Sequence, residues 1–217
     1  MKALEASATD LAAWHFRHTL WEIVGRAAEE LGKPDEAAAA YRHALATAPQ
    51  HRPSLERLAR LGGADDAERA RLNALTPEVP CEMSFEGQAR FMGYSLVADP
   101  LSATQGRAAE TQELHVYWLI RAPLAPELRA VAQLHDASGR RLRGEALPEL
   151  DSARNLRNGL SGEIVRYRYR VSAPLPAGSF VRVGLWSPEA GSEPARWLLD
   201  ELGRPFTELG LPGKRAE

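Results

Sequence analysis

The chain has 217 residues, of which 44% are hydrophobic and 26% charged, and its formal net charge is −2 at pH 7. These values are typical of a globular protein and argue against a disordered chain. The near-neutral charge gives no reason to expect nucleic acid or an anionic membrane as a partner. A single cysteine, Cys81, excludes an internal disulfide framework and a cysteine-rich metal site.

The N-terminal stretch "MKALEASATDLAAW" lacks the uninterrupted apolar core of a signal peptide. No window approaches the roughly 18 apolar residues that a membrane-spanning helix needs. We therefore expect a cytoplasmic protein with no membrane span.

The residues before Thr76 are mainly helix formers, and those after Pro80 alternate in a strand-like pattern cut by turns. Pro77 and Pro80 bracket the change and disfavour helix in the residues before them. The sequence therefore predicts a helical domain over 1–76, a linker over 77–81 and a β domain over 82–217.

Inside the helical domain, a first helix is predicted over about 18–31 and a second from Pro34, with Gly32 between them as a stop signal. Trp21, Val24 and Gly25 are expected on one face of the first helix, against the second. Small residues such as Gly25 and Ala44 let two antiparallel helices approach closely, and Tyr41 fills the remaining space. The upstream stretch "DLAAWHFRHTLW" is expected to end a separate, earlier helix. The residues after Pro49 predict two short helices broken at Gly62 and Gly63.

This hairpin resembles a tetratricopeptide repeat, a helical unit of 34 residues. The residues that carry the resemblance are Trp21, Gly25, Ala37, Tyr41, Ala44 and Pro49. Neighbouring repeats are poorer matches, and a lone repeat needs its faces covered; the flanking helices, the β domain and a partner protein all remain open as the cover. The family geometry implies a partner-binding groove lined by Thr19, Glu22, Ile23, Arg26 and Glu29.

The second half predicts about eight strands, including "ARFMGYSLVA", "ELHVYWLIR", "EIVRYRYRVS" and "SFVRVGLWS". Trp118 lies in phase with apolar neighbours and is expected in the core. Short antiparallel strands at this spacing favour a β-sandwich of jelly-roll type, so the fold class is α+β with two domains.

The segments "FEGQARFMGYSL", "ELHVYW", "LHDASGRRL", "SGEIVRYRYRV" and "LPAGSFVRVGLW" occur in this order. Together they resemble the β-sandwich module found at the C-terminus of many bacterial membrane glycosyltransferases and polysaccharide-assembly proteins. The resemblance rests on turn and core residues, which specify a sandwich and not a ligand.

Arginines alternate with apolar residues in "EIVRYRYRVS", at Arg166, Arg168 and Arg170. Such a row either forms a solvated sheet face or contacts an acidic protein or an acidic glycan, because guanidinium groups bind carboxylates in pairs of hydrogen bonds. Trp186 and Trp197 lie near loops and are candidates for stacking on sugar rings.

The sequence contains no phosphate-binding loop, dinucleotide fingerprint or nucleophile elbow. His15 and His18 lie three apart on a helix, but no nearby acid completes a metal site, so a solvated pair of histidines is expected. The carboxylates that could act as acid and base lie in turn-like sequence: Asp136, Glu145, Glu149 and Asp151. We therefore expect no catalytic residue, metal or cofactor.

The favoured interpretation is a non-catalytic scaffold that binds a protein partner through its helices and its β-sandwich. One alternative is a carbohydrate-binding accessory module of envelope-polysaccharide assembly, which exposed coplanar aromatic side chains would favour. The other is a glycoside-active enzyme, which two carboxylates about 5 to 10 Å apart in a cleft would favour.

Overall fold

The computed structural model describes residues 2–98, 111–122, 128–142, 144–146, 159–172, 175–187 and 196–211, with the backbone alone at 2–15, 111, 144–146 and 172. The chain divides into two compact units. The helical unit comprises Met1–Thr76 together with Leu160–Ile164, and the β unit comprises Pro77–Gly159 and Val165–Glu217. The short segment 160–164 was not expected in the helical unit.

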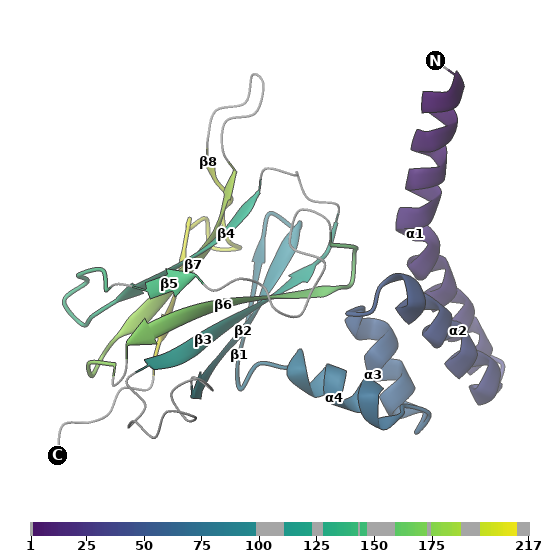
Figure 1. Cartoon of the computed structure of the whole chain (residues 1–217), viewed down its shortest axis with the longest axis horizontal. Coiled ribbons are helices and arrows are strands. Elements are labelled where there is room, and N and C mark those ends of the chain that lie inside the picture. The colour runs from purple at the N-terminus through teal and green to yellow at the C-terminus, as the bar shows by residue number, and fades with distance from the viewer. Residues whose placement is uncertain are drawn as a thin grey trace. The chain divides into compact units, whose positions relative to one another are not determined.

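Four helices form the first part of the helical unit: α1 (Lys2–Glu30), α2 (Pro34–Thr47), α3 (Arg52–Arg60) and α4 (Asp66–Ala74). α1 and α2 lie side by side, and the N-terminal part of α1 extends past α2 (Figure 1). The predicted separate helix before residue 18 is wrong, because α1 is continuous from Lys2. The reason is that no glycine or proline precedes Gly25 in the chain.

The contact between α1 and α2 depends on Gly25 and Tyr41, as predicted. Tyr41 is fully buried, and a Cβ added at Gly25 would lie 2.5 Å from Cε1 of its ring. The buried alanines Ala37 and Ala44 lie on the same helix as Tyr41. Absence of a side chain at Gly25 therefore lets the aromatic ring lie directly on the α1 backbone.

We expect Gly25→Ala to lower the free energy of unfolding by about 1–3 kcal/mol, because the added methyl group overpacks the Tyr41 ring. Urea titration followed by circular dichroism measures the change. Gly63→Ala is the matched control, since its Cβ would meet only an ordinary contact, 3.5 Å from Ala38 Cβ. If both variants unfold at the same urea concentration, the close packing of Tyr41 on Gly25 does not contribute to the free energy of unfolding.

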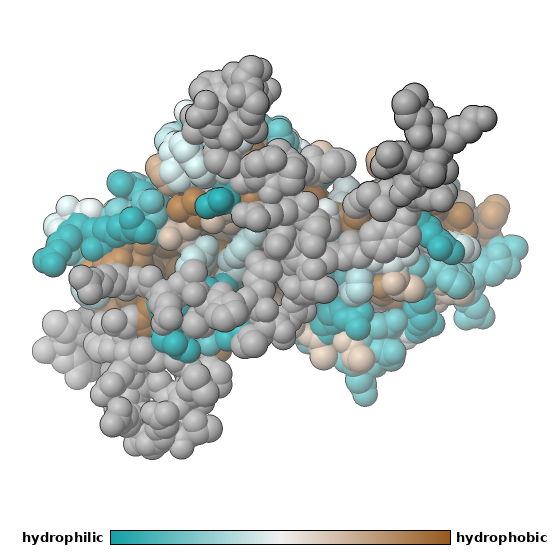
Figure 2. Space-filling view, turned by 45° about the horizontal axis from the view of Figure 1, so that its top comes forward, coloured by the Kyte–Doolittle hydropathy of each residue, from teal (hydrophilic) through white to brown (hydrophobic). Residues whose placement is uncertain are grey.

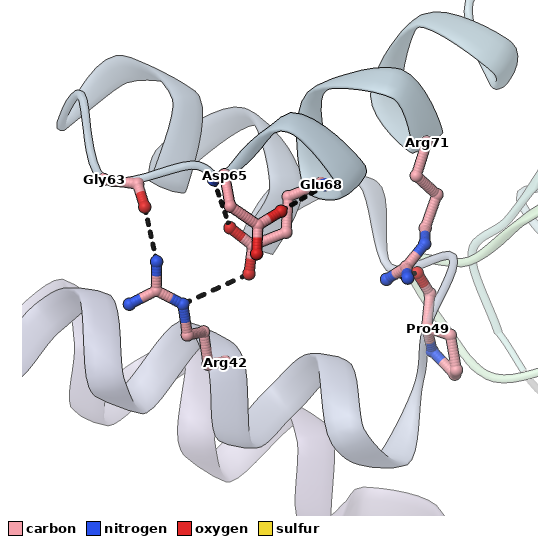
Figure 3. A network of polar contacts seen from close by, with 6 residues as sticks. All are labelled: Arg42, Pro49, Gly63, Asp65, Glu68 and Arg71. Carbon is pink, nitrogen blue, oxygen red and sulfur yellow. Dashed lines mark hydrogen bonds and ion pairs between the residues drawn. The ribbon is translucent and has the colours of Figure 1, made fainter.

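α4 begins with a capping box that also ties it to α2 (Figure 3). The Asp65 carboxylate accepts from the Glu68 backbone N–H at 2.7 Å, and the Glu68 carboxylate accepts from the Asp65 N–H at 2.9 Å. Arg42 of α2 donates from Nε to Glu68 at 3.2 Å and from Nη2 to the Gly63 carbonyl. These bonds hold the two short helices, which break at Gly62 and Gly63 as predicted.

The strands of the β unit form two sheets. The first has the order β1-β2-β3-β6-β5, with β1 at Val79–Phe85, β2 at Ala89–Ala98, β3 at Thr111–Ile120, β5 at Gly144–Ala146 and β6 at Ile164–Ser172. The second has the order β4-β7-β8 with β9 also paired to β7; these strands are β4 (Arg129–His135), β7 (Phe180–Ser187), β8 (Arg196–Trp197) and β9 (Thr207–Gly210). The α+β fold class predicted from sequence is confirmed.

The two sheets share one hydrophobic core. Trp118 of β3 is fully buried against Phe85 and Phe91, with ring centroids 5.4 Å apart in both pairs. Val181 and Val183 of β7 belong to the same cluster. Inward residues of both sheets therefore meet as expected for a sandwich.

The predicted linker over 77–81 is partly strand, because β1 begins at Val79. Val79 pairs with Tyr94 and Pro80 with Gly93, at the edge of the sheet, where a proline need not donate a hydrogen bond. Gly93 has a φ of +132°, and a Cβ there would lie 2.2 Å from the Val79 carbonyl oxygen. Pairing with β2 therefore overrides the turn-like composition of these residues.

Candidate partner-binding surface

The residues of the predicted groove all lie on α1, but they differ in exposure and in their contacts. Thr19 and Glu22 are half-buried, whereas Ile23 and Arg26 are exposed. Glu29 is half-buried and has partners inside the helical unit.

Glu29 links three helices through its two carboxylate oxygens. The Tyr41 hydroxyl of α2 donates to Oε1 at 2.7 Å, and Arg57 of α3 donates from Nη1 to Oε2 at 2.7 Å. Burial and the bond to Glu29 raise the pKa of Tyr41 to about 12, so the hydroxyl stays a donor at neutral pH. The geometry gives Glu29 a structural role between α1, α2 and α3.

One side of α1 carries a row of exposed hydrophobic residues, which we call the α1 apolar face: Phe16, Leu20, Ile23 and Val24, with exposed fractions of 57%, 61%, 53% and 49%. Their spacing of four, three and one residues places them on one side of the helix. Hydrophobic residues, in brown, reach the surface beside hydrophilic ones on the helical part at the right of Figure 2. Such a row is typical of a surface that another element covers.

The sequence analysis assigned Val24 to the buried side of α1, and this was wrong. Trp21 is the residue that faces α2, where its ring stacks on His43 with centroids 4.5 Å apart. Val24 lies three residues further along, turned away from that contact. The spacing of Phe16, Leu20 and Val24 was available in the sequence as a second apolar stripe.

On β6, Arg168 is engaged inside the β unit. Its Nε and Nη2 donate to the two oxygens of Glu113 on β3, at 2.9 and 2.7 Å, and the side chains are only 11% and 5% exposed. His115 lies 2.9 Å from the same carboxylate. The Arg168 hydrogen bonds hold the pKa of Glu113 below its ordinary value, and burial lowers the pKa of His115.

Sequence reasoning missed this cluster because it placed only Trp118 and its in-phase apolar neighbours on β3 in the core. Glu113, His115 and Tyr117 are all buried, although they alternate with the core residues Leu114 and Val116. β3 is therefore buried on both faces, and a polar residue on its second face needs a partner.

The two other arginines of β6 are half-buried. Arg170 lies opposite Glu145 in the pairing of β6 with β5, and the charge of Arg166 contributes to the lowered pKa of His115. Arg182, on β7, pairs with Glu208 at 2.7 Å on the surface.

Trp186 and Trp197 lie opposite each other on β7 and β8 and are half-buried. Their rings are 4.9 Å apart and tilted by 56°, and Trp197 packs on Phe206 at 4.4 Å with a tilt of 53°. These rings pack on one another at a tilt and do not form a coplanar platform of the kind that stacks on sugars.

Residues 18–61 match the family model of the tetratricopeptide repeat. The match covers the second half of α1, α2 and α3, and it confirms the resemblance seen in the sequence. It spans much less than half of the chain. The comparison with curated proteins finds no relative that matches.

The repeat length of 34 residues relates α1 to α3 position by position. Leu20 corresponds to Ser54 and Val24 to Leu58. Ser54 and Leu58 are both 0% exposed in α3, which α2 packs against. The tetratricopeptide register therefore assigns the α1 apolar face to the side on which a preceding helix would pack.

The remaining candidates support no catalytic site among the residues that the structure describes. Asp136 is on the surface and caps a turn through Ser138 and Arg140, which holds its pKa below the ordinary value. Glu149 and Asp151 lie outside the described residues, as do the side chains of Glu145 and His15.

The described part of the chain holds no group of three metal-ligating side chains, and none of its helices combines the length and apolar character needed to cross a membrane. An opening in the sandwich, lined by residues that include Leu114, Tyr169 and Val181, has a volume of about 30 Å³. That volume suits water and is too small for a sugar ring.

Proposed function

We propose that this protein is a non-catalytic interaction scaffold that binds an amphipathic helix of a partner protein on the α1 apolar face. The observation that carries the proposal is a contrast in exposure between residues of α1 and the residues 34 positions later in α3. Leu20 and Val24 are 61% and 49% exposed, whereas Ser54 and Leu58 are fully buried. Tetratricopeptide repeats are interaction modules, and their exposed faces are covered by neighbouring helices.

The expected occupant resembles α2, because α2 is the helix that packs on α3 in the same register. α2 uses small and medium side chains for its contacts, including Ala38, which lies beside Gly63. A partner helix with small apolar residues at spacings of three and four would fit the α1 apolar face in the same way. The opposite end of the helical array differs, since α4 exposes the polar residues Asp66, Arg69 and Asn73, as a terminal cap does.

Polar residues beside this face would set the orientation of the partner. Glu22 and Arg26 lie next to Ile23 on α1, and Thr19 completes the predicted set. In the β unit, Arg166 and Arg170 are proposed as a second contact for an acidic protein or acidic glycan. Arg168 is left out of this contact because its side chain is only 11% exposed.

The test compares Leu20→Glu/Val24→Glu with a matched control, Ala39→Glu/Ala46→Glu, which places the same two charges on exposed positions of α2. A photo-crosslinking residue at Ile23 identifies the partner and the cross-linked segment by mass spectrometry. Titration calorimetry with that segment as a synthetic peptide then measures affinity. We expect the α1 variant to bind at least about tenfold more weakly and the α2 variant to bind as the unmodified protein does.

Three outcomes would overturn the proposal. One is a cross-linked segment with no helical periodicity, and another is equal affinity for both double variants. The third is self-association that Leu20→Glu/Val24→Glu abolishes in sedimentation velocity, because the occupant would then be a second copy of this chain.

A further inference from the structure

Two buried histidines meet inside the helical unit. His18 of α1 is 1% exposed and His51, which directly precedes α3, is 2% exposed. Their rings contact edge to face with centroids 5.1 Å apart. The interpretation of His18 as a solvated histidine is therefore wrong, since the packing of α1 on the start of α3 excludes water from it.

Segment 160–164 packs against both histidines. The Arg52 N–H donates to the Gly162 carbonyl at 2.9 Å, and the Ile164 N–H donates to the Gln50 carbonyl at 3.1 Å. The same pairing forms an antiparallel bridge between His51 and Glu163. His18 adds a bond from Nε2 to the Ser161 carbonyl at 2.8 Å. The segment is thus held as a short extended peptide by backbone bonds and by one imidazole.

Gly162 is the point of closest approach. Its φ is +84°, and a Cβ there would lie 2.2 Å from Nε2 of His51. Any other residue would meet both backbone strain and the imidazole ring. The His51 ring therefore occupies the space that a side chain at position 162 would need.

The surroundings of His51 disfavour a positive charge. Nδ1 lies 2.8 Å from the Ser54 hydroxyl of α3, and the ring has no exposed edge. Burial, and then the charge of His18 from α1, lower the pKa of His51 to about 3. The one buried carboxylate opposite it in the bridge, Glu163, accepts a hydrogen bond from the Leu160 N–H at 2.8 Å. At neutral pH His51 is uncharged.

We propose that His18, His51 and Gly162 form an acid-released joint, in which the neutral His51 ring and the His18 bond to Ser161 retain segment 160–164 in the helical unit and protonation of His51 frees it. This device is independent of the proposed partner-binding function. An imidazolium ion at His51 would lack water and lie beside a second imidazole, and opening the joint hydrates both rings.

The sign of the pH dependence follows from the lowered pKa. In the open state, in which segment 160–164 has left the histidines, His51 binds a proton near its ordinary pKa of about 6.5. In the closed state, in which the segment is bound, His51 does so only at much lower pH. Closure is therefore fully favoured above about pH 6.5 and weakens as the pH falls below it. Below pH 6.5, protonation of His51 alone lowers the ratio of closed to open molecules by up to about tenfold per pH unit. Because the ratio changes little above pH 6.5, the total change between pH 7.5 and 5 is about 30-fold.

The test follows hydrogen exchange of the Arg52 and Ile164 amides by NMR from pH 7.5 to 5, after correction for the intrinsic pH dependence of exchange. The Val183 amide of β7 serves as the reference in the β unit. We expect the protection factors of the Arg52 and Ile164 amides to fall about 30-fold, while that of the Val183 amide stays constant. In the His51→Asn variant, we expect most of this fall at Arg52 and Ile164 to disappear. Constant protection, or parallel loss at Val183, would overturn the proposal.

A second measurement at pH 7.5 isolates the steric match. Gly162→Ala is compared with Gly139→Ala, which has the same φ of +84° but open space around its Cβ. We expect only Gly162→Ala to reduce protection of the two amides, by at least about tenfold, and we expect His51→Ala in the same chain to restore part of it. Unchanged protection in Gly162→Ala would contradict the steric match, and no recovery on adding His51→Ala would assign the loss to backbone strain at Gly162 and not to the histidine.

Discussion

Replacing Arg168 with methionine is expected to lower the free energy of unfolding by about 3–5 kcal/mol, because the Glu113 carboxylate would stay buried without its charge partner. Both side chains are almost fully buried, and two hydrogen bonds of 2.9 and 2.7 Å join them. Urea unfolding at pH 7, followed by tryptophan fluorescence, measures the change. The two sequence-based alternatives for the β6 arginines, a solvated sheet face or contact with an acidic partner, did not include such a buried pair.

Two variants serve as controls for Arg168→Met. Adding Glu113→Gln should recover most of the loss, because no unpaired charge remains. Arg182→Met removes an exposed ion pair with Glu208 and should cost less than about 1 kcal/mol. If Arg168→Met were no more damaging than Arg182→Met, the pair with Glu113 would carry no special stability.

The effect of Arg168→Met also depends on pH. Because Arg168 holds the pKa of Glu113 below its ordinary value, the pair stabilises the fold above the carboxyl's ordinary pKa. That contribution is lost as the pH falls through the lowered pKa. The difference in stability between the unmodified protein and the variant should therefore shrink between pH 7 and pH 3.

Tyr41→Ala is expected to lower the free energy of unfolding by about 3–5 kcal/mol, the usual cost of deleting a buried aromatic ring. The ring is fully buried against Gly25, so its loss leaves a cavity between α1 and α2. The Glu29 carboxylate would also lose the bond from the tyrosine hydroxyl. Urea titration of the helical signal by circular dichroism measures the loss.

Tyr41→Phe separates the ring from the hydroxyl. It keeps the packing on Gly25 and leaves Glu29 bonded to Arg57, so we expect a cost of about 0.5–1.5 kcal/mol. An equal loss in both variants would assign the stability to the hydrogen bond. An unchanged midpoint in both would contradict the close packing of the helical hairpin.

The repeat hairpin could be predicted from the sequence because its signals are local. Gly25 and Tyr41 occupy fixed positions of a known period, and Gly32 and Pro34 mark the turn between the helices. The two-sheet β unit followed from alternation, which placed Trp118 correctly in the core. In each case the signal is read from nearby positions in the chain: the repeat period, the turn residues, or the alternation of residues along one strand.

The structure places the residues of the predicted groove in different surroundings. Ile23 and Arg26 are exposed, whereas Glu29 is held by Tyr41 and Arg57, and Val24 lies on the outer side of α1. A helical pattern shows that a residue lies on an apolar stripe. It does not show which of two stripes the next helix covers, because that depends on the angle at which α2 packs.

The sequence by itself determined the local elements of this protein: the repeat register, the helix breaks at Gly62 and Gly63, and the inward residues of the strands. Only the tertiary structure decided which polar groups meet. Arg168 and Glu113 are 55 residues apart in the chain, and His18 and Ser161 are 143 apart. No periodicity links such positions, since strand order and the packing of segment 160–164 bring them together. Burial then removes water from these groups, and the loss of water gives each contact its energetic weight.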